Sequence, residues 1–400
     1  MSAKKRILIF TSSFPSPRNP VSGIFVEDLA RSLVAHFEVV VLAPALPGVA
    51  RCECRDGMKL LRFRQGFGGI VIAGTPGGIL PALKRNRLLL LWLPFFLALE
   101  FLALMRTVRR EKIDLIHAHW LLPQGLLAAI YKTFFNRRMR LLVTCHGSDL
   151  LKVGGGVAGR LKRFALRRTD GLTVVSELLR KRAMEAGFRG ECRILPMGVD
   201  TAVFSPECRE PDIRKRYGIE GRMILFVGSL IELKGVRSLV QAMPILLKRI
   251  PDATLLLVGG GELEPELRRM AAELGVADRV ILAGPVLHED LPAYFAQSDL
   301  FVLPSFSEGW PLVVMEALSS GAIVAVSDLP VFMNHPERDH IFRLFRAGDP
   351  ADIAAVLGEA LADPLGASRR KERREYAVSE LDLKMVGMRY ADEMNRILEA

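Results

Sequence analysis

Two glutamates near the C-terminal end of the chain have a spacing that could serve one ligand. Glu308 and Glu316 lie in the segment LPSFSEGWPLVVMEALSSG, residues 303–321. Pro311 lies between them, and proline is favoured in the first turn of a helix. We therefore expect Glu308 in a loop and Glu316 inside the following helix, where two carboxylates could bind different hydroxyl groups of an extended ligand. The alternatives are a capping role for Glu308 and a solvated Glu316, although the apolar neighbours of Glu316 disfavour solvation.

A lysine and two glycine-rich turns indicate phosphate chemistry. Lys234 is the last residue but one of the loop GSLIELKG, residues 228–235, which directly precedes a predicted helix whose N-terminus carries partial positive charge. This pairing suits a phosphate, but a solvated lysine would look the same. Gly259–Gly261 follow another predicted strand, where glycine permits close approach of a ligand or simply a tight turn. They lack the spacing of a dinucleotide-binding fingerprint, so NAD binding is disfavoured.

Three histidines follow or end predicted strands in the first half of the chain. His117 and His119 lie in DLIHAHW, and His146 lies in TCHGSD, which also contains Asp149. We expect His117 and His119 on opposite faces of their strand, so that one of them faces a ligand. No carboxylate has the spacing of a metal ligand, so we expect no metal site. A structural role is the alternative for each histidine.

Alternating apolar strands and amphipathic helices must position these residues. Strands are predicted at residues 7–11, 38–43, 113–119, 141–146 and 171–176, and again at 223–227, 254–258, 280–283, 300–303 and 323–327. This pattern predicts an α/β fold with two doubly wound parallel-sheet domains, which bind ligands at the carboxyl ends of their strands. We place the domains at residues 1–200 and 206–378, with a C-terminal helix at about 380–400 that packs back on the first domain.

The charge is divided unevenly along the 400 residues. Residues 1–200 contain 32 Lys+Arg and 14 Asp+Glu, a charge of +18, whereas residues 201–400 carry −7. The basic half suggests an anionic partner: a nucleic acid, a membrane surface or a phosphorylated substrate. Interleaved aromatic residues and recognition motifs are missing, which argues against nucleic acid. Five scattered cysteines and no signal peptide favour a cytoplasmic protein.

One segment, residues 88–105, is almost wholly apolar. Its uncharged part, residues 88–99, is shorter than the roughly 20 residues that span a bilayer. Either it is a buried core helix, or it lies in the membrane interface. The second alternative draws on flanking basic residues, which are Lys84, Arg85, Arg87, Arg106, Arg109 and Arg110, and on Lys162, Arg163, Arg167 and Arg168 further along the chain.

Taken in order, these motifs resemble the family 4 retaining glycosyltransferases of the GT-B fold. The resemblance covers nearly the whole length. Its motifs are the loop through Gly23, HAHWLLPQG at 117–125, TCHGSD at 144–149, VVSELLR at 174–180, LPMGVDTAVFSP at 195–206, VGSLIELKG at 227–235, LLLVGGGEL at 255–263 and the E-x7-E segment at 303–321. It implies two domains that face each other across a cleft. It also implies transfer of a sugar, most simply a hexose, from a nucleotide-diphosphate sugar to a hydroxyl acceptor, without metal or other cofactor.

The resemblance implies a role for each motif residue. Glu316 would bind the ribose, Glu308 the donor sugar, and Lys234 the departing diphosphate. His119 would face the donor sugar and serve catalysis with Glu308 and Lys234. The other implied donor-binding residues are Gly23, Gly228, Ser229, Gly260, Val286, Gly309, Trp310 and Pro311. His146 and Asp149 are candidates for the acceptor side.

Two departures from the family pattern keep alternatives open. Ser229 stands where the family usually has arginine, and residues 329–349 replace the usual Pro-Glu and glycine-rich turn. The chain could therefore be a catalytically weakened nucleotide-sugar-binding homologue, or a nucleotide-sugar epimerase of the same fold, which the E-x7-E motif disfavours. Otherwise we expect a lipid-linked or saccharide acceptor and peripheral attachment to an anionic membrane, at the inner face of the cell membrane.

Overall fold

The computed structural model describes residues 4–17, 19, 22–66, 71–74, 79, 86, 88–151, 156–209, 211–363 and 369–400. The chain divides into two compact units, which are described separately: unit 1 comprises Met1–Gly198 and Leu383–Ala400, and unit 2 comprises Val199–Asp382. Lys84, Arg85 and Arg87 of the predicted basic flank lie outside the described residues.

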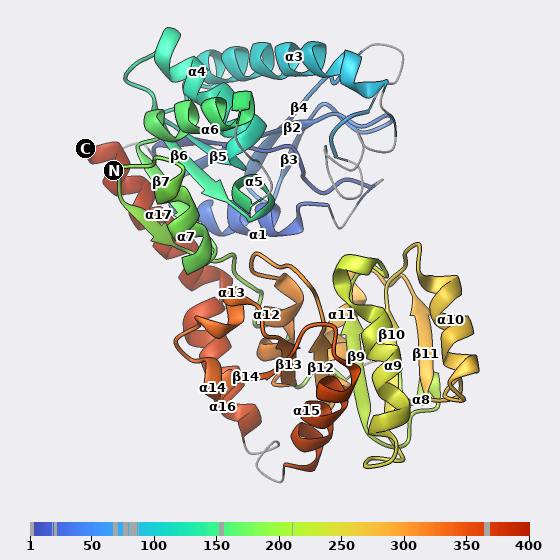
Figure 1. Ribbon diagram of the computed structural model, residues 1–400. Helices are drawn as coiled ribbons and strands as arrows, with labels where there is room; N and C mark the ends of the chain where they lie inside the picture. Colours follow the sequence, from blue (N-terminus) through green and yellow to red (C-terminus); the bar gives the residue numbers. More distant parts are fainter. Residues whose placement is uncertain are drawn as a thin grey trace. The chain divides into compact units, whose positions relative to one another are not determined.

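Unit 1 is built around a sheet that has eight strands within the described residues, in the order β3-β4-β2-β1-β5-β6-β7-β8. Among the strands that the structure describes, β3 and β4 pair antiparallel and the other neighbours pair parallel. The strands are β1 (Arg6–Phe10), β2 (Glu38–Pro44), β3 (Cys52–Arg55), β4 (Met58–Phe63), β5 (Leu115–His119), β6 (Arg140–Cys145), β7 (Gly171–Val174) and β8 (Cys192–Ile194). The central strands read as continuous apolar runs because helices cover both faces of the sheet (Figure 1).

Helices of unit 1 alternate with these strands. They are α1 (Ile24–Leu33), α3 (Leu89–Arg110), η1 (Leu121–Gly125), α4 (Leu126–Phe134), α5 (Ser148–Leu151), α6 (Gly156–Arg168) and α7 (Glu177–Glu185). The C-terminal helix α17 (Leu383–Glu399) belongs to the same unit and packs against α1 and β6. There Tyr390 is fully buried and donates a hydrogen bond from its hydroxyl group to the Leu195 carbonyl at 2.9 Å.

Unit 2 contains a parallel sheet of six strands within the described residues, in the order β11-β10-β9-β12-β13-β14. The strands are β9 (Met223–Val227), β10 (Thr254–Val258), β11 (Val280–Gly284), β12 (Leu300–Leu303), β13 (Ile323–Ser327) and β14 (Phe342–Phe345). The helices are α8 (Ile213–Tyr217), η2 (Glu232–Lys234), α9 (Val236–Leu246), α10 (Glu264–Glu273), η3 (His288–Asp290), α11 (Leu291–Gln297), α12 (Leu312–Ser319), α13 (Pro330–Met333), α14 (Arg338–Ile341), α15 (Pro350–Ala362), α16 (Arg369–Tyr376) and η4 (Ala377–Leu381). The predicted fold class, two parallel-sheet α/β domains, is confirmed.

Helix α3 has one face on the protein and one face in solvent (Figure 1). It packs against β2, β4 and α4, yet only 17% of its most apolar 18-residue stretch is buried, so of the two alternatives the buried core helix is wrong. Within the described residues it is the one helix long and apolar enough to cross a membrane. Its fully buried Glu100 accepts a hydrogen bond from Gln124 Nε2 at 2.8 Å, and burial raises the pKa of this carboxyl to about 8.

The contact of α17 with α1 depends on a glycine. A Cβ atom added to Gly387 would lie 2.6 Å from Ser32 Oγ and 2.7 Å from Ser32 Cβ, closer than real atoms approach. We therefore predict that Gly387→Val lowers the free energy of unfolding by about 1–3 kcal/mol, the usual cost of overpacking. Urea unfolding measures this free energy. The control is Met388→Val, because Met388 is an exposed neighbour of Gly387. Equal stability of the two variants would contradict this role for Gly387.

Candidate active site

Three loops at the carboxyl ends of β9, β10 and β12 interlock through their backbones. A Cβ atom on Gly235 would lie 1.9 Å from the Pro304 carbonyl oxygen, and one on Gly259 would lie 2.0 Å from the Gly228 carbonyl oxygen. Hydrogen bonds join the same loops, because Phe306 N donates to Leu233 O at 2.9 Å. Only glycine permits this approach, and Gly235 also has a positive φ of 65°. The loop that carries Lys234 and the loop that carries Glu308 are thereby held together.

Lys234 and Glu308 form an ion pair on these loops. Lys234 Nζ lies 2.6 Å from Glu308 Oε1, and the two side chains are 22% and 10% exposed. Lys234 ends η2, and α9 begins two residues later, so the ammonium group lies beside a helix N-terminus. A cation and a helix N-terminus together attract phosphate, and Glu308 is the carboxylate that an incoming anion would displace.

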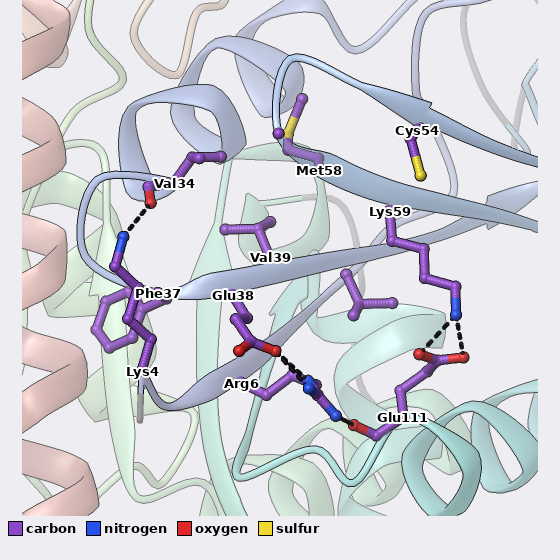
Figure 2. Close-up of a pocket in the computed structure, with 12 residues that line it drawn as sticks. Lys4, Arg6, Val34, Phe37, Glu38, Val39, Cys54, Met58, Lys59 and Glu111 are labelled. Carbon is purple, nitrogen blue, oxygen red and sulfur yellow. Dashed lines mark hydrogen bonds and ion pairs between the residues drawn. The ribbon is translucent and has the colours of Figure 1, made fainter. Parts of the chain in front are cut away.

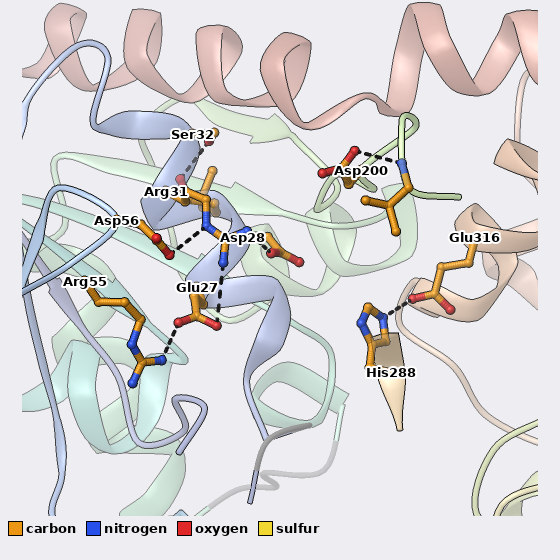
Figure 3. Close-up of polar contacts among 11 residues, drawn as sticks. Glu27, Asp28, Arg31, Ser32, Arg55, Asp56, Asp200, His288 and Glu316 are labelled. Carbon is orange, nitrogen blue, oxygen red and sulfur yellow. Dashed lines mark hydrogen bonds and ion pairs between the residues drawn. The ribbon is translucent and has the colours of Figure 1, made fainter. Parts of the chain in front are cut away.

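Glu316 is buried in α12 and is held by a histidine that the sequence did not reveal. His288 Nε2 lies 2.8 Å from Glu316 Oε1, while the buried Oε2 atom of Glu316 has no partner among the described residues (Figure 3). His288 begins η3, just beyond the carboxyl end of β11. Its position at this edge of the sheet is the only signal that could have identified it. Glu316 therefore keeps one oxygen available for a ligand.

Trp310 packs into an aromatic cluster formed by the segment that departs from the family pattern. Its ring stacks on His335 with centroids 5.2 Å apart, and the Tyr376 hydroxyl group lies 3.0 Å from His335 Nε2. Burial lowers the pKa of His335, which favours a neutral ring. The rebuilt segment thus supports the loop between Glu308 and Pro311.

The remaining predicted donor-binding residues of unit 2 surround these loops. Gly228 N donates to Val258 O at 2.9 Å, and the Gly260 carbonyl accepts from Leu230 N at 3.0 Å. Ser229 is exposed, and Val286 lies half-buried beyond the end of β11. Gly309 and Pro311 flank Trp310 directly before α12.

The histidines of unit 1 form a stacked cluster at the ends of β5 and β6. His119 Nδ1 lies 3.0 Å from His146 Nε2, with the two rings nearly parallel, and the rings of His117 and His119 have centroids 4.4 Å apart. The expectation that His117 and His119 lie on opposite faces is wrong, because side chains two residues apart on a strand share a face. Phe25, at the start of α1, packs against His146 with ring centroids 4.9 Å apart.

All three imidazoles are kept neutral by burial. Burial lowers the pKa of His117 and of His146 to about 3, and it lowers the pKa of His119 well below the usual value. His117 Nε2 bonds with Thr144 Oγ1 at 2.7 Å, whereas His119 Nε2 is buried without a hydrogen-bond partner among the described residues. His119 thus has a free ring nitrogen.

Asp149 and Gly23 organise the backbone around this cluster. Asp149 accepts hydrogen bonds from Leu121 N at 3.0 Å and Gly147 N at 3.1 Å, and burial raises the pKa of its carboxyl group. Gly23 precedes α1 with φ of 75°, and a Cβ atom there would lie 2.3 Å from the Ser13 carbonyl oxygen. Asp149 is thus bonded to two strand-end loops, and Gly23 fixes the start of α1. The chain ranges that the structure describes hold no group of three or more His, Cys, Asp or Glu arranged around a metal position.

The neutral histidines predict how stability depends on pH. Unfolded histidine binds a proton near pH 6.5, but folded His117 and His146 do so only near pH 3, so the unfolded state binds more protons between these values. Stability should fall as pH drops below 6.5, by up to about 1.4 kcal/mol per pH unit for each histidine. Urea unfolding followed by tryptophan fluorescence should give a shallower slope for His146→Phe when both proteins are referenced to pH 8. An unchanged slope would contradict a neutral, buried His146.

Comparison with known proteins places the chain in a family. The family model described as "Glycosyltransferase Family 4" matches residues 22–203, and the one described as "Glycosyl transferases group 1" matches residues 221–363. Over 334 residues the chain is 35% identical to the GDP-mannose-dependent alpha-(1-6)-phosphatidylinositol monomannoside mannosyltransferase of Mycobacterium tuberculosis, covering 80% of this chain and 79% of that protein.

Solved structures share the fold at low sequence identity. Sucrose-phosphate synthase from Thermosynechococcus elongatus has a TM-score of 0.78 and 22% identity, covering 99% of this chain and 100% of that chain. HepE from Anabaena in complex with UDP has a TM-score of 0.73 and 18% identity, covering 98% of this chain and 100% of that chain. The chain therefore belongs to glycosyltransferase family 4, has the GT-B fold, and is a glycosyltransferase that uses a nucleotide-sugar donor.

Proposed function

We propose that this protein transfers a hexose, with retention of configuration and without a metal clamp, to a lipid-linked acceptor at the inner face of the cell membrane. The observation that carries the proposal is the Lys234–Glu308 ion pair beside the N-terminus of α9. It supplies the two charges that glycosyl transfer from a nucleotide-diphosphate sugar requires: a cation for the leaving group and a carboxylate for sugar hydroxyl groups.

Binding of the donor would break the Lys234–Glu308 ion pair and give each side chain a new partner on the donor. Negative charge develops on the diphosphate as the bond to the anomeric carbon breaks, and a preorganised cation stabilises that charge. Lys234 would turn from Glu308 to the diphosphate, and Glu308 would then accept hydrogen bonds from the donor sugar. The acceptor hydroxyl group would pass its proton to an oxygen of the departing diphosphate while its own oxygen bonds to the anomeric carbon. No protein carboxylate then needs to act as nucleophile.

Glu316 and His119 would complete the donor contacts. The unpartnered Oε2 atom of Glu316 suits a ribose hydroxyl group, while His288 holds the other oxygen. The free ring nitrogen of a neutral His119 suits a hydrogen bond with a sugar hydroxyl group. Gly309, Trp310 and Pro311 would bring backbone groups to the sugar and the diphosphate. Support comes from HepE, whose solved structure holds UDP.

The exposed apolar face of α3 supports the proposal that the acceptor is linked to a lipid. Leu91 is 76% exposed and Phe95 is 59% exposed, and Phe134, at the end of neighbouring α4, is 71% exposed. A helix with one face on the protein and a wide apolar face outside suits the membrane interface better than water. The mycobacterial relative is named for a phosphatidylinositol monomannoside and for GDP-mannose, so GDP-mannose is the first donor to test.

The ion pair predicts two different kinetic defects. Lys234→Ala should weaken binding of the nucleoside diphosphate and lower kcat/KM by about 10²- to 10³-fold, because the leaving group loses its cation. Glu308→Ala should lower transfer but leave nucleoside-diphosphate binding intact, because Lys234 remains. Calorimetry and sugar-transfer assays measure the two effects, and Lys248→Ala, at an exposed position two residues beyond the C-terminal end of α9, is the control. Full activity of both site variants would refute this site, whereas saturable binding without transfer by the wild type would favour the weakened homologue.

The His288–Glu316 contact predicts that histidine positions the ribose ligand. We expect Glu316→Gln to weaken nucleotide binding by about 10- to 100-fold and His288→Ala by about 10-fold, the range for losing one charge-assisted hydrogen bond. Exposed Glu289, the neighbour of His288, offers the control Glu289→Ala. Titration calorimetry compares a nucleoside with its 2′-deoxy form. A lost ribose contact weakens binding of the nucleoside more than of the deoxy form, whereas a distorted site weakens both. If both forms bind the Glu316→Gln variant as they bind the wild type, Glu316 does not contact the ribose.

A further inference from the structure

A groove with a basic wall and an apolar wall lies between α3 and the outer strands of the unit 1 sheet. Its volume is about 490 Å³. Leu61 and Phe63 of β4 line it from the sheet, and from α3 it is lined by Leu99, Leu102, Arg106 and Arg110. These four α3 residues lie on one face of the helix, because they are three or four positions apart. The groove therefore changes from apolar to basic along the length of α3.

The basic wall carries positive charge that the protein leaves uncompensated. Arg51, Arg106 and Arg110 are exposed, and none of them forms an ion pair or a side-chain hydrogen bond with any part of the chain that the structure describes. The carboxylate that lines the groove, Glu111, is already bonded to Lys59 Nζ at 2.7 and 2.8 Å. The groove can therefore accept an anion without breaking an existing ion pair.

A neighbouring hollow of the same unit shows the opposite arrangement (Figure 2). Its volume is about 560 Å³, and its charged groups are matched within the chain. Arg6 Nε donates to Glu38 Oε2 at 2.7 Å, and Lys4 Nζ donates to the Val34 carbonyl at 3.0 Å. The unmatched arginines are thus a property of the α3 groove and not of every hollow in this basic unit.

The apolar wall indicates what kind of anion fits. Leu102 is 45% exposed beside the arginines, and the exposed apolar face of α3 continues from it toward Leu91 and Phe95. A free phosphate would use only the basic wall, whereas a phospholipid would place its phosphodiester against the arginines and its acyl chains along the leucines.

We propose that the α3 groove binds the headgroup of an anionic membrane phospholipid, which anchors the protein to the membrane. The inference rests on the proposed function, which puts α3 at a membrane. Leu42 of β2 also lines the groove, and β1 separates β2 from β5, which ends in His119. At roughly 4.8 Å per strand, the groove therefore lies about 10 Å from the histidine cluster across the sheet. The lipid phosphate and the histidine cluster thus occupy different places on unit 1.

Vesicle binding by the full chain tests this proposal. The probes are phosphatidylcholine vesicles with and without phosphatidylglycerol, in a sedimentation assay at fixed salt concentration. Arg51→Ala/Arg106→Ala/Arg110→Ala should weaken binding to the anionic vesicles on the order of 100-fold, because each basic residue near a charged surface contributes about fivefold. A control that removes the same charge from exposed positions in unit 2, Lys215→Ala/Lys248→Ala/Arg269→Ala, should bind like the wild type.

The proposal would be overturned by no preference of the wild type for anionic vesicles, by an equal loss in both triple variants, or by unchanged binding of the groove variant. Thermal stabilisation of the wild type by inorganic phosphate without vesicle preference would indicate a free-phosphate site instead, and would also overturn it. The groove variant should keep nucleoside-diphosphate binding, which confirms that it folds. Because the assay needs no turnover, failure of the groove proposal and failure of the proposed transfer reaction are separable.

Discussion

Contact between glycine Cα atoms and backbone carbonyl groups is the constraint on which the donor site of unit 2 depends. Gly235, Gly259 and Gly261 each lie where a Cβ atom would fall within 2.3 Å of a carbonyl oxygen of another loop. Any other residue would push apart the loops that follow β9, β10 and β12. Lys234 and Glu308 are separated by 74 positions in the sequence, yet they lie within bonding distance because these loops cannot separate. The chemistry of the site therefore begins with residues that carry no functional group.

The parts of this structure that follow from local pattern could be predicted from the sequence. Buried parallel strands are continuous apolar runs, so the two sheets and the edge that bears Lys234, Glu308 and Glu316 were predictable. Contacts across space were not. His288 was missed because nothing in its neighbourhood marks it as the partner of Glu316. The antiparallel strand β3 was missed because its short, half-exposed segment has no apolar run.

Two errors have different physical origins. His117 and His119 were placed on opposite faces against the two-residue period of a strand, although their rings stack. The core-helix alternative for residues 88–105 treated apolar composition as burial, but burial depends on how many neighbours surround a helix. Elements pack against one face of α3, so its other leucines remain outside. Composition can establish that a helix avoids water, but it cannot identify what covers the helix.

Glu100 would fix how α3 meets the bilayer that we propose for it. A helix that is apolar on every side could rotate about its axis, or sink deeper, with little change in free energy. Glu100 removes this freedom, because any rotation that turns Leu91 and Phe95 toward the sheet carries the carboxyl group away from Gln124 and toward lipid. An acidic group at the centre of a bilayer costs about 2.5–3.5 kcal/mol even by the lower estimates. One buried acid therefore sets the angular orientation of the helix, and with it the side of unit 1 that would face the proposed membrane.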